Sequence, residues 1–249
     1  MASRPRVLVF EHMTAGHAGI FADFWHDQGI VCHTVRLDLD EPIPDLAAFD
    51  TLWVMGGPMD VWQEAEHPWL VAEKAAIRTA VADLGMPYVG ICLGHQLLAE
   101  ALGGEVGPAP TPEVGVFDIA FTDAGRRDPL MAGLPEQTKV LQWHTAEVKR
   151  PPDGATVLAT SPLCAVQAML IGERALGLQF HLEVDDRTLD GWLAIPENAA
   201  ALVKRLGPDG PARFAAAARQ HMAGSNQTAR RLHENLTALL APVASSAAR

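Results

Sequence analysis

The chain has 249 residues, of which 49% are hydrophobic and 20% charged, an ordinary composition for a globular protein with a full core. Its formal net charge of −11 argues against a general nucleic-acid binder or a protein that binds anionic membranes. Its three cysteines give no even disulfide framework and no Cys-x-x-Cys pair, which is typical of a reducing compartment.

At the N-terminus, residues 1–6 lead into an apolar run that is too short for the core of a signal peptide. No stretch of the sequence approaches the length of a membrane span. We therefore expect a cytoplasmic protein with neither nucleic acid nor membrane as a partner.

The first half of the chain alternates apolar segments of strand length with longer helical patterns. The expected strands are 6–10, 31–37, 51–55 and a short one beginning at residue 88, and the expected helices are 16–29, 67–84 and one that closes at residues 103–104. Strands that are apolar on both faces and alternate with helices predict an α/β fold with a doubly wound, mostly parallel sheet of the flavodoxin type.

The second half changes character twice. Closely spaced strands are expected at 115–122, 139–144, 156–161, 165–171 and 175–180, which predicts an antiparallel addition to the sheet. Residues 186–240 are helical and rich in alanine, with breaks at Pro196 and at residues 207–210, and we expect a loose tail over 241–249. We expect a single domain over 1–249 with a C-terminal helical extension from about residue 186.

The most informative motif is a strand, a sharp turn and a helix around Cys92. Gly90 and Gly94 flank the cysteine at two positions on either side, in the Gly-x-nucleophile-x-Gly pattern of a nucleophile elbow. The start of the following helix favours a thiolate there, because the helix dipole is positive at that end. A lone cysteine is more often buried and inert, so the interpretation depends on partners elsewhere in the chain.

Candidate partners follow two other predicted strands. His181 ends an apolar strand, and Glu183, two residues on, points the same way by the alternation of a strand, so its carboxylate can orient the imidazole. The backbone N–H groups of Leu93 and Gly57 are candidate donors to an oxyanion, because loops at the carboxyl ends of neighbouring parallel strands line one crevice. Each motif alone is weak, since His-x-Glu is often two solvated residues and Gly-Gly-Pro is often an ordinary turn.

Together, Gly-Gly-Pro at 56–58, Gly-Ile-Cys-Leu-Gly-His-Gln at 90–96 and Gln-Phe-His-Leu-Glu at 179–183 resemble the class I, triad-type glutamine amidotransferase family. The chain looks like a stand-alone protein similar to the glutaminase domain of GMP synthase, and the resemblance covers residues 6–184. It implies that Cys92 is the nucleophile that forms a γ-glutamyl thioester, with His181 as general acid and base and Glu183 as its orienting partner. It also implies an oxyanion hole made by Gly57 and Leu93.

The resemblance further implies a substrate pocket lined by Gly56, Pro58, Gln96 and His144, although His144 is equally compatible with a satisfied core histidine. The sequence departs from the pattern at two positions. Ala146 stands where such relatives usually carry an aspartate, which puts tight glutamine binding in doubt. His95 stands where small residues are usual; at a helix N-terminus it should stay neutral, and it could contact a substrate or partner.

The leading hypothesis is an amidotransferase or glutaminase that acts on glutamine or another γ-glutamyl small molecule and needs no cofactor or metal. No Gly-x-x-x-x-Gly-Lys-Ser/Thr loop is present, so the acceptor of the ammonia would lie on another chain, such as a synthetase subunit, or not exist. The alternatives are a free-standing γ-glutamyl amide or peptide hydrolase with the same triad, and a non-catalytic binding protein on the same fold. A metal hydrolase is weaker still, because no His-Glu-x-x-His motif occurs.

Overall fold

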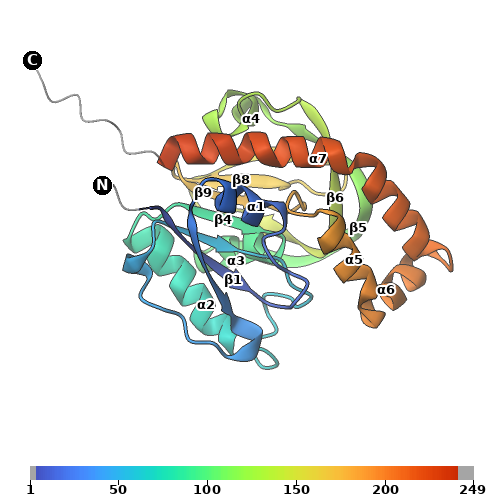
Figure 1. Cartoon of the computed structure of the whole chain (residues 1–249), viewed down its shortest axis with the longest axis horizontal. Helices are drawn as coiled ribbons and strands as arrows, with labels where there is room; N and C mark the ends of the chain where they lie inside the picture. Colours follow the sequence, from blue (N-terminus) through green and yellow to red (C-terminus); the bar gives the residue numbers. More distant parts are fainter. Residues whose placement is uncertain (1–3, 241–249) are drawn as a thin grey trace, which may run out of the picture.

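The computed structural model describes residues 4–240 and contains a mixed sheet of nine strands (Figure 1). Five neighbouring strands are parallel: β1 (Arg6–Glu11), β2 (Val31–Arg36), β3 (Thr51–Val54), β4 (Tyr88–Ile91) and β9 (Ala175–Leu178). They lie in the order β2-β1-β3-β4-β9, the flavodoxin-type order, and this confirms the predicted fold class.

The predicted antiparallel addition is also confirmed. It comprises β5 (Glu105–Phe121), β6 (Gln137–Arg150), β7 (Ala155–Thr160) and β8 (Ala168–Ile171), which extend the sheet beyond β9 in the order β8-β7-β5-β6. The expected strand over 115–122 begins ten residues earlier, at Glu105, because β5 runs through a Pro-rich stretch where its pairing with β6 shifts register between Pro108 and Glu113. Prolines at an irregularity of the ladder hide a strand from its sequence pattern.

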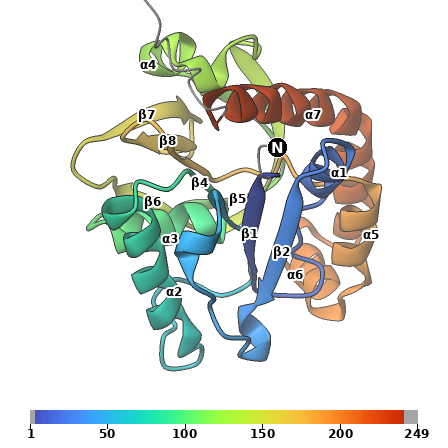
Figure 2. The ribbon, with the colours of Figure 1, turned by 60° about the vertical axis from the view of Figure 1, so that its left-hand side comes forward.

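Helices cover both faces of the parallel strands (Figure 2). On one face α1 (Ile20–Asp27) packs with α7 (Gly210–Leu240), and on the other α2 (Trp69–Arg78) packs with α3 (Leu93–Ala101). Alternate residues of β1 supply the two cores: Val7 and Val9 face the α1 side, whereas Leu8 and Phe10 face the α2 side. A sheet that is apolar on both faces therefore requires the doubly wound arrangement.

Two predicted helices are shorter than expected. The helix expected over 16–29 begins at Ile20, since Gly19 has a positive φ of 53° and a Cβ there would lie 1.9 Å from the carbonyl oxygen of Glu183. The helix expected over 67–84 is α2 followed by a π-helical turn, Thr79–Asp83.

The C-terminal segment forms three helices, α5 (Asp186–Ala194), α6 (Pro196–Leu206) and α7. The predicted breaks are confirmed, because Pro196 begins α6 and α7 begins at Gly210. The 31-residue α7 packs against α1, β5 and β6 (Figure 1). None of the helices within residues 4–240 is long and apolar enough to cross a membrane. The expected loose tail, 241–249, lies outside the described residues.

Candidate active site

The elbow around Cys92 is a sharp turn between β4 and α3. Cys92 has φ 54° and ψ −102°, a backbone conformation that is costly for a residue with a Cβ, and α3 begins at the next residue, Leu93. A Cβ at Gly90 would lie 2.5 Å from the backbone of Gly94, and a Cβ at Gly94 would lie 2.1 Å from the carbonyl oxygen of Val54. Both glycines are therefore required by close backbone approach.

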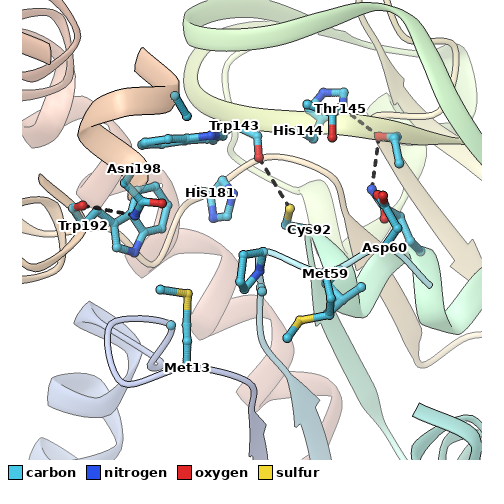
Figure 3. A pocket seen from close by; sticks show the side chains of 18 of the residues that line it. Met13, Met59, Asp60, Cys92, Trp143, His144, Thr145, His181, Trp192 and Asn198 are labelled. Atoms are coloured by element: carbon cyan, nitrogen blue, oxygen red, sulfur yellow. Dashed lines mark hydrogen bonds between the residues drawn. The ribbon is translucent and has the colours of Figure 1, made fainter. Parts of the chain in front are cut away.

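Cys92 faces a cavity of about 260 Å³ at the carboxyl ends of the parallel strands (Figure 3). Every site residue predicted from the sequence lines it: Gly56, Gly57, Pro58, Cys92, Leu93, Gln96, His144, His181 and Glu183. The structure thus brings together residues that are up to 127 positions apart along the chain. The parallel order of β3, β4 and β9 places all of them at one edge of the sheet except His144, which lies on β6.

His181 and Glu183 form a tight buried pair. The Nδ1 atom of His181 lies 2.6 Å from Oε1 of Glu183, and the two residues are 4% and 2% exposed. The backbone N–H of His181 donates to the carbonyl of Leu141 at 2.9 Å, which ties this segment to β6. The edge of the Trp192 ring meets the imidazole at 4.8 Å between centroids, so the ring of His181 is held on several sides.

The imidazole also meets the thiol of Cys92. A Cβ at Gly56 would lie 3.3 Å from Cε1 of His181 and 3.6 Å from Cβ of Cys92, so both side chains converge on this glycine. Burial alone would lower the pKa of His181, but the Glu183 carboxylate and the Cys92 sulfur outweigh it and raise the pKa to about 10. Such a site favours an imidazolium beside sulfur, the arrangement from which a thiolate attacks an acyl carbon.

The two residues expected to supply oxyanion donors, Leu93 and Gly57, both line the same cavity. The backbone N–H of Leu93 is the first of α3, and the first N–H groups of a helix have no intrahelical acceptor. Gly57 lies close to Leu93, because a Cβ at Gly57 would be 3.0 Å from Cδ2 of Leu93. Paired N–H donors beside a nucleophile are suited to binding an oxyanion.

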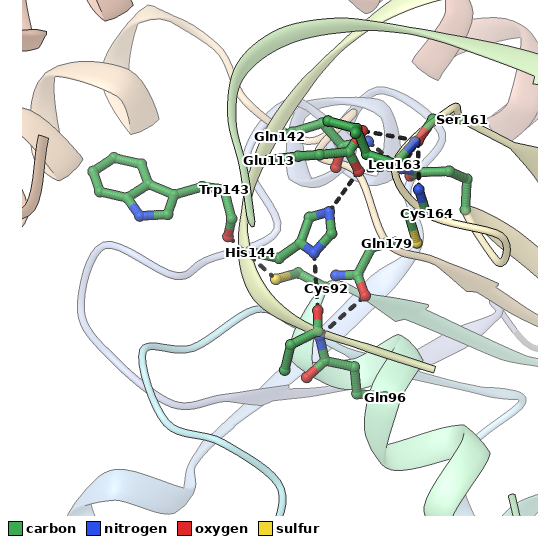
Figure 4. A network of polar contacts seen from close by, with 12 residues as sticks. Cys92, Gln96, Glu113, Gln142, Trp143, His144, Ser161, Leu163, Cys164 and Gln179 are labelled. Atoms are coloured by element: carbon green, nitrogen blue, oxygen red, sulfur yellow. Dashed lines mark hydrogen bonds and ion pairs between the residues drawn. The ribbon is translucent and has the colours of Figure 1, made fainter. Parts of the chain in front are cut away.

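His144 is both a wall of the cavity and a satisfied histidine (Figure 4). Its Nδ1 lies 2.9 Å from the carbonyl oxygen of Ala146, and its Nε2 lies 2.9 Å from Oε2 of Glu113. Glu113 in turn accepts from Ser161 Oγ at 2.8 Å and from Gln167 Nε2 at 2.6 Å. Both ring nitrogens of His144 are therefore engaged within the protein, so its contribution to the cavity is shape.

The two departures noted in the sequence have different outcomes. The carbonyl of Ala146 accepts a hydrogen bond from Gln96 Nε2 at 3.1 Å. Ala146 lines the cavity, but its side chain supplies no carboxylate there. His95 is fully buried, and burial, with His144 nearby, lowers its pKa to about 3, so the expected neutral state holds. The expectation that His95 could contact a substrate is wrong, because the His95 ring packs on β9, where a Cβ at Gly177 would lie 2.5 Å from Nδ1 of His95.

Several cavity residues were not anticipated from the sequence. Trp192 and Asn198 come from α5 and α6, so the C-terminal helices form one wall. Asp60 lies in the loop after Gly56–Pro58, and Figure 3 shows it across the cavity from Trp192 and Asn198. Asp60 could have been predicted from the sequence, since it follows a candidate substrate loop. In contrast, nothing in the sequence pattern of α5 or α6 indicates which face of each helix lines the cavity.

The chain is similar to proteins of a known family. The family model described as "Glutamine amidotransferase class-I" matches residues 26–193. A glutamine amidotransferase-like protein, YfeJ, from Salmonella typhimurium is 35% identical over 190 residues, which cover 75% of this chain and 79% of that protein.

GMP synthases are also similar. A glutamine-hydrolyzing GMP synthase subunit from Sulfolobus acidocaldarius is 37% identical over 151 residues, covering 60% of this chain and 76% of that protein. The GMP synthase of Aeropyrum pernix is 41% identical over 162 residues, covering 63% of this chain; the match spans only 29% of that longer protein.

Solved structures agree over almost the whole chain. A glutamine amidotransferase from Thermotoga maritima superposes with a TM-score of 0.84 at 25% identity, covering 94% of this chain and 99% of that one. A glutamine amido transferase from Methylobacillus flagellatus superposes with a TM-score of 0.83 at 27% identity, covering 95% of each chain.

Proposed function

Because the chain belongs to the class I glutamine amidotransferase family, we propose that it hydrolyses the side-chain amide of glutamine, or of another γ-glutamyl compound, through Cys92, His181 and Glu183. The observation that carries the proposal is that a thiol, a carboxylate-held imidazole and the residues of two candidate N–H donors, Gly57 and Leu93, line one cavity. Each of the four requirements of acyl transfer by a cysteine has a candidate there.

In this mechanism His181 holds the proton and the Cys92 thiolate attacks the amide carbon. The N–H groups of Gly57 and Leu93 stabilise the oxyanion of the tetrahedral intermediate. His181 then donates its proton to the leaving nitrogen, so that ammonia departs and a γ-glutamyl thioester remains. A water molecule gives its proton back to His181 and attacks the thioester, which releases the acid and restores Cys92. Glu183 keeps the imidazole oriented in both halves.

Asp60 is the proposed anchor for the substrate α-ammonium group. Apart from Glu183 it is the one carboxylate among the described residues that line the cavity, and these residues include no lysine or arginine. Its side chain makes no hydrogen bond or ion pair with another described residue, so it is available to a ligand. Burial raises the pKa of the Asp60 carboxyl, and a bound cation would favour its ionised form. Asp60 thus supplies the negative charge that Ala146 lacks.

The C-terminal helices belong to the same functional unit in this proposal, as expected for one domain. Trp192 touches the ring of His181, and the Trp143 ring lies edge-on to Phe214 of α7, at 5.0 Å between centroids. Loss of residues 186–240 would therefore open the cavity as well as uncover the sheet.

The second candidate is a free-standing hydrolase of other γ-glutamyl amides or peptides. Ala146 favours it, because a cavity without the usual carboxylate at that position suits a substrate other than glutamine. The two candidates differ in what becomes of the leaving group: an amidotransferase passes ammonia to a synthetase on another chain, whereas a hydrolase releases ammonia, an amine or a peptide into solution.

The test is hydrolysis by the purified chain, measured as ammonia released from glutamine and as the ammonia or amine released from a panel of γ-glutamyl amides and peptides. Cys92→Ala should abolish hydrolysis, whereas Cys32→Ser, at an exposed cysteine outside the cavity, should leave it unchanged. Slow glutamine hydrolysis that a synthetase fraction accelerates supports the amidotransferase. Fast, partner-independent turnover of another γ-glutamyl compound supports the hydrolase. Full activity in Cys92→Ala would refute both.

A further inference from the structure

A second buried histidine–glutamate pair lies behind the loop that supplies Gly57. Nε2 of His12 is 2.8 Å from Oε1 of Glu73, and Nδ1 of His12 is 3.2 Å from the carbonyl oxygen of Gly56. Neither side chain is exposed, and the His12 ring stacks on Trp69 with 5.4 Å between centroids. Neither residue lines the cavity, so the pair does not touch a substrate.

The two contacts determine the protonation of the His12 ring. A carbonyl oxygen only accepts, so Nδ1 must carry a proton to bond Gly56, and a carboxylate accepts the proton of Nε2. Burial disfavours a charged ring, but Glu73 and the Gly56 carbonyl outweigh it and raise the pKa of His12. The two contacts and the raised pKa thus favour an imidazolium at His12 that donates on both sides.

The carbonyl of Gly56 and the N–H of Gly57 belong to one peptide unit. The unit is planar and trans, as are all peptide bonds of the described residues, so its C=O and N–H point in opposite directions. Since the oxygen points at His12, the N–H points away from His12. The other side of this loop is the cavity, because a Cβ at Gly56 would meet His181 and Cys92.

We propose that the His12–Glu73 pair is a positioning device for the oxyanion hole: it fixes the Gly56–Gly57 peptide so that the Gly57 N–H is directed at the oxyanion. The inference rests on the proposed acyl-transfer function. A charged donor on the carbonyl also polarises the peptide, which strengthens its N–H as a donor. Preorganised donors of this kind lower the barrier because they need not reorient during the reaction.

The test uses three variants and one matched control. His12→Phe keeps a ring against Trp69 and removes both donors. His12→Asn restores an N–H near the position of Nδ1, and Glu73→Gln removes the charge while keeping a hydrogen-bonding partner. The control is His233→Phe, which alters a buried histidine that packs on Phe24 away from the cavity.

Three readouts separate positioning from stability. We expect His12→Phe to lower kcat for amide hydrolysis about 100-fold, near the effect of losing one oxyanion donor, with KM almost unchanged. His12→Asn should recover about ten-fold, Glu73→Gln should fall between, and His233→Phe should retain kcat. Alkylation of Cys92 by iodoacetamide needs no oxyanion hole, so its rate should be the same in all four. The amide NMR signal of Gly57 should shift in His12→Phe and return toward wild type in His12→Asn.

The inference is overturned if the Gly57 amide signal does not move in His12→Phe, or if kcat there equals wild type. Equal loss of kcat in the Phe and Asn variants would also contradict it, because the restored N–H would then have no effect. The NMR readout is independent of turnover, so a wild-type chain that hydrolyses no γ-glutamyl amide refutes the proposed function without hiding the result for His12.

Discussion

Substitution of Gly94 by alanine adds one methyl group at the point where α3 leaves the elbow. That Cβ would lie 2.1 Å from the carbonyl oxygen of Val54 and 2.8 Å from its carbonyl carbon, and both are backbone atoms of a buried strand. Contacts of a Cβ below 3.0 Å do not persist, so α3 and β3 must separate by about 0.9 Å at this point. Overpacking of this kind costs about 1–3 kcal/mol of stability.

The same displacement moves the N-terminus of α3, which carries Cys92 and the N–H of Leu93. A misplacement of about 1 Å in an active site costs on the order of 100-fold in rate. Gly94→Ala should therefore lower both the free energy of unfolding, measured by urea denaturation, and kcat for amide hydrolysis.

The matched control is Gly224→Ala in α7, where an added Cβ has nothing within 4 Å. It should stabilise the protein by about 0.5–1 kcal/mol, since alanine favours a helix over glycine, and leave kcat unchanged. A Gly94→Ala protein as stable and as active as wild type would refute the account of the elbow.

Three further outcomes are expected. Glu183→Gln should lower the pKa of His181 from about 10, as followed by NMR titration, because the variant lacks the carboxylate that counteracts the effect of burial. In the same variant kcat should fall by less than the roughly 10³-fold loss expected for His181→Ala, and equal losses would contradict the division of roles. Asp60→Asn should raise KM for glutamine about 10-fold with little change in kcat, and an unchanged KM would exclude Asp60 as the anchor. Burial raises the pKa of Glu11 to about 7, so its stabilising protonated form is complete below about 4.5 and is lost as pH rises through 7. Glu11→Gln should therefore gain stability relative to wild type between pH 5 and pH 8 in urea titrations, and a constant difference would contradict the shift.

The parallel half of the fold was predictable because its strands are buried on both faces. Val7 to Phe10 form an unbroken apolar run, and such runs alternating with helices admit few arrangements. Cys92 was predictable for a related reason, since a nucleophile on an elbow requires glycines at fixed positions, here Gly90 and Gly94.

Other features depend on contacts that the local pattern does not contain. The beginning of β5 was hidden by prolines at 108, 110 and 112. His12 and Glu73 are 61 residues apart in the sequence, and neither one alone is distinguishable from an ordinary polar residue, so the pair could not be predicted. The packing of Trp192 on His181 depends on how α5 returns across the strand ends, which the helical period does not specify.

The central claim is that Cys92 is the nucleophile that carries the γ-glutamyl group. The direct measurement is labelling of the purified chain with a glutamine-directed diazoketone, followed by mass spectrometry of its peptides. Burial raises the pKa of the Cys164 thiol to about 12, and Cys32 is exposed and lies outside the cavity, so neither thiol is placed to react with a bound glutamine analogue. We expect one label, on Cys92, absent from His181→Ala; a label on Cys32 or Cys164 in place of Cys92 would contradict the assignment.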